Sequence, residues 1–145
     1  PSIKSTNFLN NIQAKIEAIK AGAYEGIMLN WEGFVAEGTI SNIGMVKKGI
    51  LYTPHLKSGI LKGVTRDLVL SLAKKKHIPV KETLLKPQDF LAADECFITN
   101  TTMEIMPVTR IGRKVIGKGK PGPITAVLSQ AYTREVRRCI PMQAS

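Results

Sequence analysis

Two short turns that end in glycine, each between apolar, strand-like segments, constrain the fold of this chain more than any other feature. The first turn, WEG, joins residues 24–30 to 34–38, and the second, KKG, joins residues 41–46 to 50–54. Strand-like segments joined by three residues that contain glycine are typical of β-hairpins. The sequence therefore predicts two hairpins within the first 54 residues.

Helical periodicity alternates with these strand pairs along the chain. We expect helices over about residues 7–21, 64–76 and 124–138, a short helical turn over 86–93, and further strands over 78–85, 95–100 and 103–111. Strand pairs interspersed with helices indicate an α+β domain. A length of 145 residues suits a single domain with one core.

Each expected helix carries apolar residues at helical spacing, which is the pattern of a helix with one apolar face. Gly22 supplies the usual stop for the first helix. The apolar residues are Leu9, Ile12, Ile16 and Ile19 in the first helix, Val64, Leu68 and Leu72 with Val69 and Ala73 beside them in the second, and Ile124, Val127, Leu128 and Ala131 in the last.

The formal net charge of +10 is compatible with a polyanionic partner. However, the densest basic groups, at residues 74–76 and 134–138, fall where helices are expected to end and where cations complement the helix dipole. Aromatic residues make up only 6% of the chain and do not alternate with the basic ones. The sequence therefore predicts no nucleic-acid partner, with a cofactor-free polyanion-binding module kept as an alternative.

The cysteines and the hydropathy narrow the class of protein further. Cys96 and Cys139 form neither a metal-binding spacing nor a disulfide framework, so no metal site is expected. Cys96 lies in an apolar segment, where we expect a buried thiol. These cysteines fit a reducing, cytoplasmic location, and no apolar run approaches the roughly 18 residues of a membrane span, so no membrane partner is expected.

Two glycine-containing segments carry features of phosphate-binding sites. GKGKPG matches the spacing G-x-G-x-x-G, but Pro121 removes a backbone donor and no acidic residue follows about 20 residues later, so we interpret it as a loop. GILKGVTRD is more informative, because Gly63 turns directly into a helix whose free N–H groups at Val64 and Thr65 suit an anion. The alternative is an ordinary helix start in which Asp67 complements the helix dipole.

Polar residues near strand ends, together with one early lysine, form the remaining candidates. The segment FITNTTMEIMP places residues 99–102 between two apolar strands, where their side chains serve turn geometry or bind phosphate or carboxylate. Glu37, at the strand end in FVAEGTISN, is either solvated or, if half-buried, paired with a protonated group. Lys4 has a functional role only if burial lowers its pKa or a carbonyl partner forms a Schiff base with it.

Taken in order, these motifs resemble one known family. The match runs through IKSTNFL, EGFVAEGTISN, GILYTP, GILKGVTRD, ADECFITNTTMEIMPV and GKPGPIT, which covers nearly the whole chain except the last dozen residues. The chain resembles the C-terminal portion of the fold type IV, or class IV, pyridoxal-phosphate enzymes, which include branched-chain aminotransferase, D-amino-acid aminotransferase and aminodeoxychorismate lyase. The resemblance implies mixed sheets that form a pseudo-barrel with flanking helices, and pyridoxal 5'-phosphate as cofactor.

The resemblance assigns roles to individual residues. Lys4 matches the lysine that holds the cofactor as a Schiff base and then moves the α-proton of the substrate. Glu37 matches the carboxylate that hydrogen-bonds the pyridine nitrogen, and Leu61 matches the apolar residue under one face of the ring. Val64 and Thr65 match the helix start that binds the phosphate.

The turn after residue 99 carries the other implied contacts. Thr101 matches a phosphate-binding hydroxyl, and Asn100 stands beside it, where the family has a smaller residue. The backbone of Thr101 and Thr102 is expected near the substrate carboxylate. Phe8 is a departure, because it stands near the position where branched-chain enzymes have a tyrosine hydroxyl by the cofactor.

The resemblance also implies a larger protein. Family members have a smaller N-terminal domain before the lysine, so residues 1–145 are expected to be the cofactor-binding C-terminal domain without that N-terminal domain. Family members usually form homodimers. The implied partners are therefore an amino acid, a keto acid, the missing N-terminal domain and a second subunit.

The implied activity is transamination between a branched-chain L-amino acid or a D-amino acid and a 2-keto acid. The segments TRD, TTMEI and GKPGPIT are closer to the aminotransferases, whereas LNNI and the TN of FITNTT are closer to aminodeoxychorismate lyase, an enzyme of p-aminobenzoate and folate synthesis. The lyase therefore stays open as an alternative. A catalytically silent structural domain is a further alternative.

Overall fold

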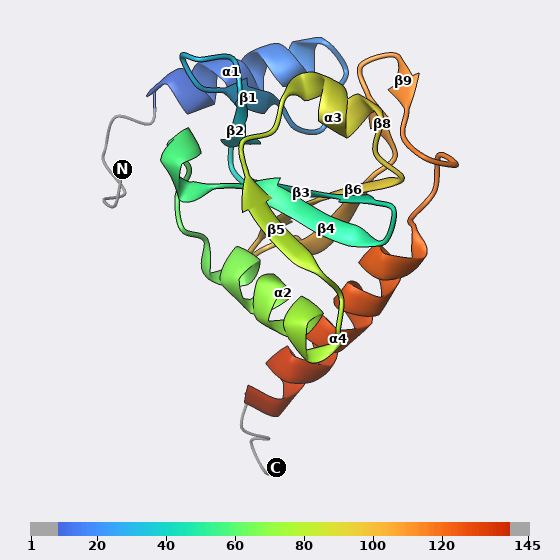
Figure 1. Cartoon of the computed structure of the whole chain (residues 1–145). Helices are drawn as coiled ribbons and strands as arrows, with labels where there is room; N and C mark the ends of the chain where they lie inside the picture. The colour runs from blue at the N-terminus through green and yellow to red at the C-terminus, as the bar shows by residue number, and fades with distance from the viewer. Residues whose placement is uncertain (1–8, 140–145) are drawn as a thin grey trace.

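The structure is a computed structural model that describes residues 9–139, an α+β domain built around one larger sheet (Figure 1). Its helices are α1 (Leu9–Lys20), the 3-10 turn η1 (Leu56–Ser58), α2 (Val64–Lys75), α3 (Pro87–Leu91) and α4 (Pro123–Cys139). Its strands are β1 (Ile27–Leu29), β2 (Val35–Gly38), β3 (Asn42–Lys47), β4 (Ile50–Pro54), β5 (Val80–Thr83), β6 (Glu95–Asn100), β7 (Glu104–Val108), β8 (Arg110–Ile111) and β9 (Lys114–Val115). The expected α+β class is confirmed.

The main sheet has five strands in the order β5-β4-β3-β6-β7. The strands β4 and β5 are parallel and are connected through α2, whereas the other neighbouring pairs of this sheet are antiparallel. Both predicted hairpins are confirmed, since β1 pairs with β2 and β3 pairs with β4 in antiparallel register. The mixed sheet brings the start of β3 beside the end of β6, with Asn42 opposite Thr99.

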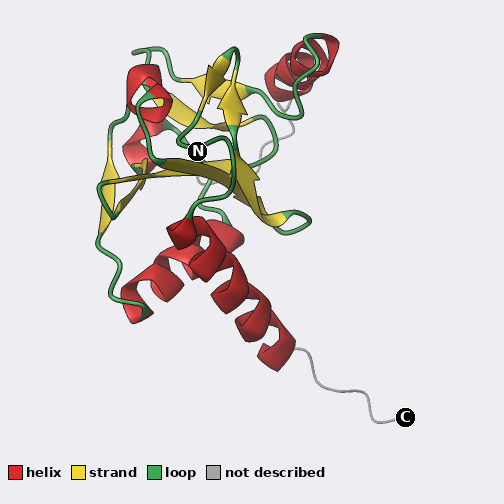
Figure 2. Ribbon diagram, turned by 90° about the vertical axis from the view of Figure 1, so that its right-hand side faces the viewer, coloured by secondary structure: helices red, strands yellow, loops and turns green. Residues whose placement is uncertain are grey.

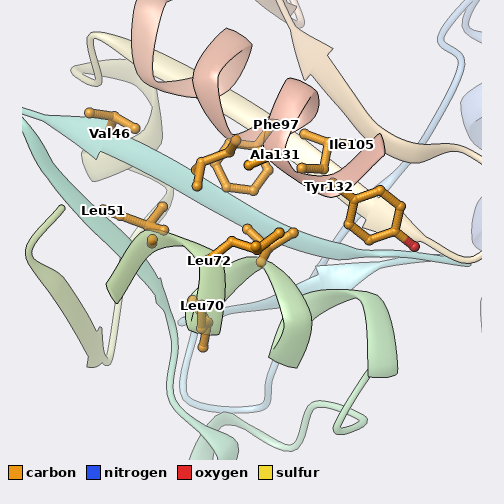
Figure 3. Packing of buried hydrophobic residues seen from close by; sticks show 11 residues of the cluster. Val46, Leu51, Leu70, Leu72, Phe97, Ile105, Ala131 and Tyr132 are labelled. Atoms are coloured by element: carbon orange, nitrogen blue, oxygen red, sulfur yellow. The ribbon is translucent and has the colours of Figure 1, made fainter. Parts of the chain in front are cut away.

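Apolar residues cover both faces of this sheet, because successive side chains of a strand point to opposite sides. On β6, Phe97 joins a core with α2 and α4, while Cys96 and Ile98 join a second core on the other face. Figure 2 shows α2 and α4 together on one side of the sheet. In Figure 3, Leu72 of α2 and Tyr132 of α4 lie near Phe97 within the first core.

The second core lies under the β1–β2 ribbon and α3. Val35 and Phe90, which are 1% exposed, come from β2 and α3 and pack against residues of β3 and β6. Burying a side chain of this size contributes about 1.5–3 kcal/mol to the free energy of unfolding. The ribbon that carries Glu37 is therefore anchored to the main sheet by core packing.

The structure corrects two of the predicted inward-facing residues. Val64 is 78% exposed, because it is the first residue of α2 and stands at the open end of the helix. Val127 is 42% exposed, because the buried face of α4 runs through Leu128, Ala131 and Tyr132 instead. Spacing alone does not set the rotation of a helix about its axis, which is decided by the partners it packs against.

The predicted strands are longer than the observed ones where other contacts compete. The expected strand over 103–111 is broken after Val108, and Arg110 and Ile111 pair with β9 in a separate hairpin. The expected strand over 24–30 shrinks to Ile27–Leu29, since the carboxylate of Glu25 binds the turn after β2.

The helix expected over 7–21 is confirmed as α1, but its apolar side is largely uncovered. Leu9, Ile12, Ile16 and Ile19 are between 47% and 70% exposed. Gly22 has a φ of 77° just beyond the end of the helix, which is the left-handed geometry of a glycine stop.

None of the helices within residues 9–139 has the length and apolar character required to cross a membrane.

Candidate functional site

Glu37 lies on β2 and is held by two donors. Its Oε2 atom accepts hydrogen bonds from the backbone N–H of Leu61 at 3.0 Å and from the side-chain amide of Asn42 at 3.3 Å. Half-burial disfavours the charged form and raises the pKa of Glu37, and the Leu61 N–H partly opposes this rise. The carboxylate is thus fixed in orientation and suited to a protonated partner.

A second carboxylate holds the turn that follows Glu37. Glu25 accepts hydrogen bonds from the Thr39 N–H at 3.2 Å, from the Thr39 hydroxyl and from the Ser41 hydroxyl at 3.1 Å. Gly38 is required here, because a Cβ at this position would overlap the Ser41 hydroxyl oxygen. The conformation of the chain from Glu37 to the start of β3 is therefore determined by local contacts.

The N-terminus of α2 is open and suits an anion. Gly63 stands at the N-cap without a side chain, and the first intrahelical bond runs from the Asp67 N–H to the Gly63 carbonyl at 3.0 Å. Thr65 is 3% exposed, and its hydroxyl has no hydrogen-bond partner within the described part of the chain. A buried hydroxyl without a partner is costly, so it points to a ligand that supplies the missing bond.

The alternative of an ordinary helix start is weakened by the contacts of Asp67. Its carboxylate lies 3.4 Å from the Arg66 guanidinium and 3.7 Å from the Lys62 ammonium. These cations compete with the helix N-terminus for its charge. The carboxylate also leaves the Thr65 hydroxyl without a partner among the described residues.

Arg66 fixes the first turn of α2 against the sheet. The guanidinium is buried and donates to the Pro54 carbonyl at 3.1 Å and to the Glu82 carboxylate at 2.7 Å. The hydrogen bond from Arg66 lowers the pKa of Glu82, although burial of Glu82 acts in the opposite direction. These bonds hold the first turn of α2 against β4 and β5.

Asn100 shapes the turn between β6 and β7. Its Oδ1 accepts from the N–H groups of Thr102 at 3.0 Å and Met103 at 2.7 Å, and its Nδ2 donates to the Ile40 carbonyl at 3.2 Å. Asn100 therefore acts through turn chemistry, which was one of the two roles that the sequence allowed. Thr101 and Thr102 are exposed in this turn.

The structure brings most of the predicted residues to one end of the sheet. Asn42 donates to Glu37 and to the Leu61 carbonyl at 3.0 Å, and it pairs in register with Thr99, one residue before Asn100. The start of α2 follows Leu61 by three residues. Lys4 lies outside the described residues.

Asn42 is the functional candidate that the sequence motifs did not identify. It is 8% exposed, although it is polar, and it contacts two predicted site residues. The signal was present in ISN, where an asparagine opens an apolar strand five residues after Glu37.

An open cleft of about 300 Å³ lies beside Glu37. It is lined by Asn11 of α1, Trp31 of the β1–β2 turn and Ser58 of η1, among others. The Ser58 hydroxyl is buried and has no partner among residues 9–139. This volume lies at the lower end of the range for small-molecule sites.

Together these features suit a small molecule with a phosphate group and a basic ring nitrogen. The α2 N-terminus and the Thr65 hydroxyl provide donors for the phosphate. Glu37 provides an acceptor for a protonated nitrogen. A ligand of this chemistry matches the cofactor that the sequence motifs implied.

Comparisons with known proteins point in the same direction. The chain is 47% identical over 132 residues to a Methanocaldococcus jannaschii protein that is provisionally named a branched-chain-amino-acid aminotransferase. This match covers 91% of this chain and 46% of that protein. It is 43% identical over 136 residues to a D-alanine aminotransferase of Listeria monocytogenes, covering 94% of this chain and 47% of that enzyme. The chain thus spans about half the length of the curated relatives it matches.

Solved structures share the fold as well. The crystal structure of a branched-chain amino acid aminotransferase from T.th. with pyridoxamine 5'-phosphate superposes with a TM-score of 0.88 at 38% identity, covering 93% of this chain and 45% of that one. Residues 1–111 match the sequence profile of the family described as amino-transferase class IV. On this match and the shared fold, the chain belongs to the class IV aminotransferases.

Proposed function

We propose that the protein containing this chain is a pyridoxal-phosphate-dependent aminotransferase. The observation that carries the proposal is the buried Thr65 hydroxyl, unpartnered within residues 9–139, at the uncapped N-terminus of α2. It stands on a segment that Asn42 links to Glu37 through the Leu61 carbonyl. The T.th. relative, which shares this fold, holds pyridoxamine 5'-phosphate.

The described residues fit this cofactor at both of its ends. The phosphate would be held by the N–H groups of Val64 and Thr65 and by the hydroxyls of Thr65 and Thr101. The ring nitrogen would be held by Glu37, whose carboxylate keeps that nitrogen protonated. Leu61 would contact one face of the ring, and Asn100 keeps the adjacent turn in shape.

The cofactor supplies an electron sink that stabilises the negative charge left when the α-proton of an amino acid is removed. The protein has to move that proton, and we propose Lys4 as the base whose Nζ accepts it and later returns it. The backbone of Thr101 and Thr102 would bind the substrate carboxylate. Pairing of Glu37 with a protonated nitrogen offsets the burial that raises its pKa.

The proposed substrates are a branched-chain L-amino acid or a D-amino acid with a 2-keto acid as the amino-group acceptor. The names of the relatives support both groups of substrates. Those names favour transamination over the elimination catalysed by aminodeoxychorismate lyase. Membership of the family likewise favours an enzyme over a polyanion-binding module or a silent domain.

We further propose that the active protein contains an additional, N-terminal domain and acts as a cytoplasmic homodimer. The coverage of less than half of each relative supports a longer chain. The exposed apolar residues of α1 support the presence of another protein surface over this helix. The second surface would complete the cleft beside Glu37.

The first experiment identifies the cofactor and the lysine together. The full-length protein is loaded with pyridoxal phosphate, reduced with borohydride and digested, and the modified peptide is located by mass. We expect a pyridoxyl group on Lys4 in the wild type and none at that position in Lys4→Arg. Lys20→Arg is the matched control and should keep the label on Lys4. A folded wild-type protein without label on Lys4 would contradict the proposal.

A second experiment identifies the substrate. The full-length protein is incubated with 2-oxoglutarate and with leucine, D-alanine or aminodeoxychorismate in separate reactions. Glutamate formation with leucine or D-alanine would establish transamination and its handedness. Release of pyruvate from aminodeoxychorismate without glutamate formation would overturn the proposed transamination in favour of the lyase.

A further inference from the structure

We propose that Asn42 is a positioning residue that holds the Glu37 carboxylate for the ring nitrogen and couples it to the start of α2. The inference rests on the proposed function for the identity of the ligand. The coupling between Asn42 and Glu37 rests on contacts within the chain alone. None of the sequence motifs assigned a role to Asn42.

Three hydrogen bonds link the buried side-chain amide of Asn42, the carboxylate of Glu37 and the backbone of Leu61 to one another. The Asn42 side-chain nitrogen donates to Glu37 Oε2 at 3.3 Å and to the Leu61 carbonyl at 3.0 Å. The Leu61 N–H donates to the same Glu37 oxygen at 3.0 Å. Asn42 therefore holds both the carboxylate and the backbone segment that also binds it.

This arrangement leaves one carboxylate oxygen for a ligand. Both donors reach Oε2, and among residues 9–139 none donates to Oε1 of Glu37. Glu37 also lines the open cleft. The Asn42 amide thus fixes the plane of the carboxylate and leaves its other oxygen for the protonated nitrogen.

The same side chain reaches the α2 N-terminus. A Cβ added to Gly63, the N-cap residue, would overlap the Asn42 side-chain oxygen. Gly63 has a φ of −74°, so its backbone does not require glycine and the requirement is for space. One asparagine therefore lies between the carboxylate for the ring and the helix start for the phosphate.

Only a neutral donor serves this position well. A donated hydrogen bond favours the ionised carboxylate and opposes the effect of burial on Glu37. Asn42→Asp keeps the shape but replaces the donor with a like charge. It should shift the titration midpoint of Glu37 to higher pH and misalign the carboxylate.

The test begins with the cofactor-free full-length protein labelled with 13C at the glutamate carboxyl carbons. Glu37→Gln assigns the Glu37 resonance. We expect the midpoint of its titration to move to higher pH in Asn42→Asp and, through displacement of the amide, in Gly63→Ala. Gln130→Glu, which makes the same amide-to-carboxylate change at an exposed position on α4, should leave the midpoint unchanged. Lys57, a cation that lines the same cleft as Glu37, is present in every variant, so it does not account for a difference between them.

An unchanged midpoint in folded Asn42→Asp would overturn the inference. If Asn42→Asp fails to fold by circular dichroism, Gly63→Ala and Asn42→Ser decide the question by the same measurement. Because no cofactor is present, this result does not depend on the proposed function.

The second readout is the dissociation constant for pyridoxal phosphate. We expect the dissociation constant to rise about tenfold in Asn42→Asp, because this variant loses one charge-assisted hydrogen bond to Glu37. In Gln130→Glu, which keeps that bond, the dissociation constant should change by less than about twofold. Equal affinity in wild type and Asn42→Asp would overturn the positioning role and leave the proposed function intact. A wild-type protein that binds no pyridoxal phosphate would instead refute the proposed function and the role toward a ring nitrogen.

Discussion

The buried hydroxyl of Thr65 stands next to the open N-terminus of α2. It has no hydrogen-bond partner among the described residues. Thr125, by contrast, is equally buried, and its hydroxyl and N–H both donate to Glu95 at 2.7 Å. The two threonines therefore allow a buried hydroxyl without a partner among the described residues to be compared with one that has a structural partner. The difference is measurable without knowing the substrate.

Replacing each threonine with valine tests this difference. Thr65→Val removes a hydroxyl without a partner, so the free energy of unfolding of the cofactor-free protein should stay the same or rise by about 1 kcal/mol. Thr125→Val breaks a bond to a carboxylate and should lower it by about 1.5–3 kcal/mol. Urea denaturation gives both values. A large loss of stability in Thr65→Val would contradict the assignment of its hydroxyl to a ligand.

Cys96 and Cys139 should differ in reactivity. Burial of Cys96, with a smaller effect of the neighbouring Glu95 charge, raises its pKa to about 12, so the thiol stays protonated near neutral pH. Cys139 is exposed at the end of α4. Iodoacetamide at mildly alkaline pH should therefore modify Cys139 and spare Cys96 in the folded protein, as measured by peptide mass. Rapid labelling of Cys96 without urea would show that the second core is open.

Among the secondary-structure elements, α4 is anchored by Glu95 of β6. Its carboxylate accepts from the N–H groups of Ile124 at 3.1 Å and Thr125 at 2.7 Å, and so caps the helix from a neighbouring strand. Gly122 leaves the space that this carboxylate occupies. Glu95→Gln should lower the free energy of unfolding by about 1–2 kcal/mol, because the capping charge is lost.

The control for this change is Glu135→Gln on α4 itself, where the side chain forms a long ion pair with exposed Arg138 at 3.9 Å. Its effect on urea denaturation should be within about 0.5 kcal/mol. Equal effects of the two substitutions would mean that Glu95 does not cap α4.

The pair of Arg66 and Glu82 joins α2 to β5 and makes stability depend on pH. The Arg66 hydrogen bond lowers the pKa of Glu82 in the folded state, so at acidic pH the unfolded chain binds more protons. The pair therefore stabilises the folded state above the ordinary glutamate pKa. This contribution is lost as pH falls through the folded-state pKa of Glu82.

Glu82→Gln should remove this pH-dependent contribution. Glu82 is 38% exposed, so the expected loss at neutral pH is below about 1 kcal/mol after solvent screening. Thermal unfolding from neutral to acidic pH should show a smaller decrease in the melting temperature for Glu82→Gln than for the wild type. Glu32→Gln, on an exposed turn, is the control. An identical pH dependence in Glu82→Gln and wild type would refute the contribution of the pair.

For the domain as a unit, the most consequential surface is α1, an amphipathic helix whose apolar side is uncovered in the described part of the chain. Ile12 and Ile16 are 50% and 47% exposed on a helix that makes few contacts with the rest of the described domain. Exposed apolar residues grouped in this way favour association. The 145-residue chain should therefore self-associate as its concentration rises.

Analytical ultracentrifugation of the double variant Ile12→Gln with Ile16→Gln tests this expectation. The variant should remain monomeric at concentrations where the wild type associates, with little change in the free energy of unfolding. Val115→Gln and Val127→Gln, which alter exposed valines elsewhere, are the controls. Persistent association of the α1 variant would place the contact on another surface.

Much of the fold was predictable because local signals and long-range packing agree. The WEG and KKG turns predicted the β1–β2 and β3–β4 hairpins, and the structure contains both. The outward position of Val127 was not predictable, because a helix can rotate by a fraction of a turn with little change in its sequence pattern. Val64 is exposed for another reason, since it is the first residue of α2. The end of β7 at Val108 was not predictable either, because it depends on the separate pairing of Arg110 with Val115 of β9.

The candidate site divides in the same way. The sequence alone predicted the α+β class, and it identified the glycine before Val64 and the carboxylate of Glu37 as candidates. Each of these follows from the residues of a short segment, which are the same wherever that segment lies in the fold. Folding was needed to show that Asn42 holds Glu37, that the Thr65 hydroxyl lacks a partner among residues 9–139 and that Asn100 binds its own turn. These properties depend on which groups from distant segments meet in space, and hydrogen-bond distances and burial exist only after the chain has folded.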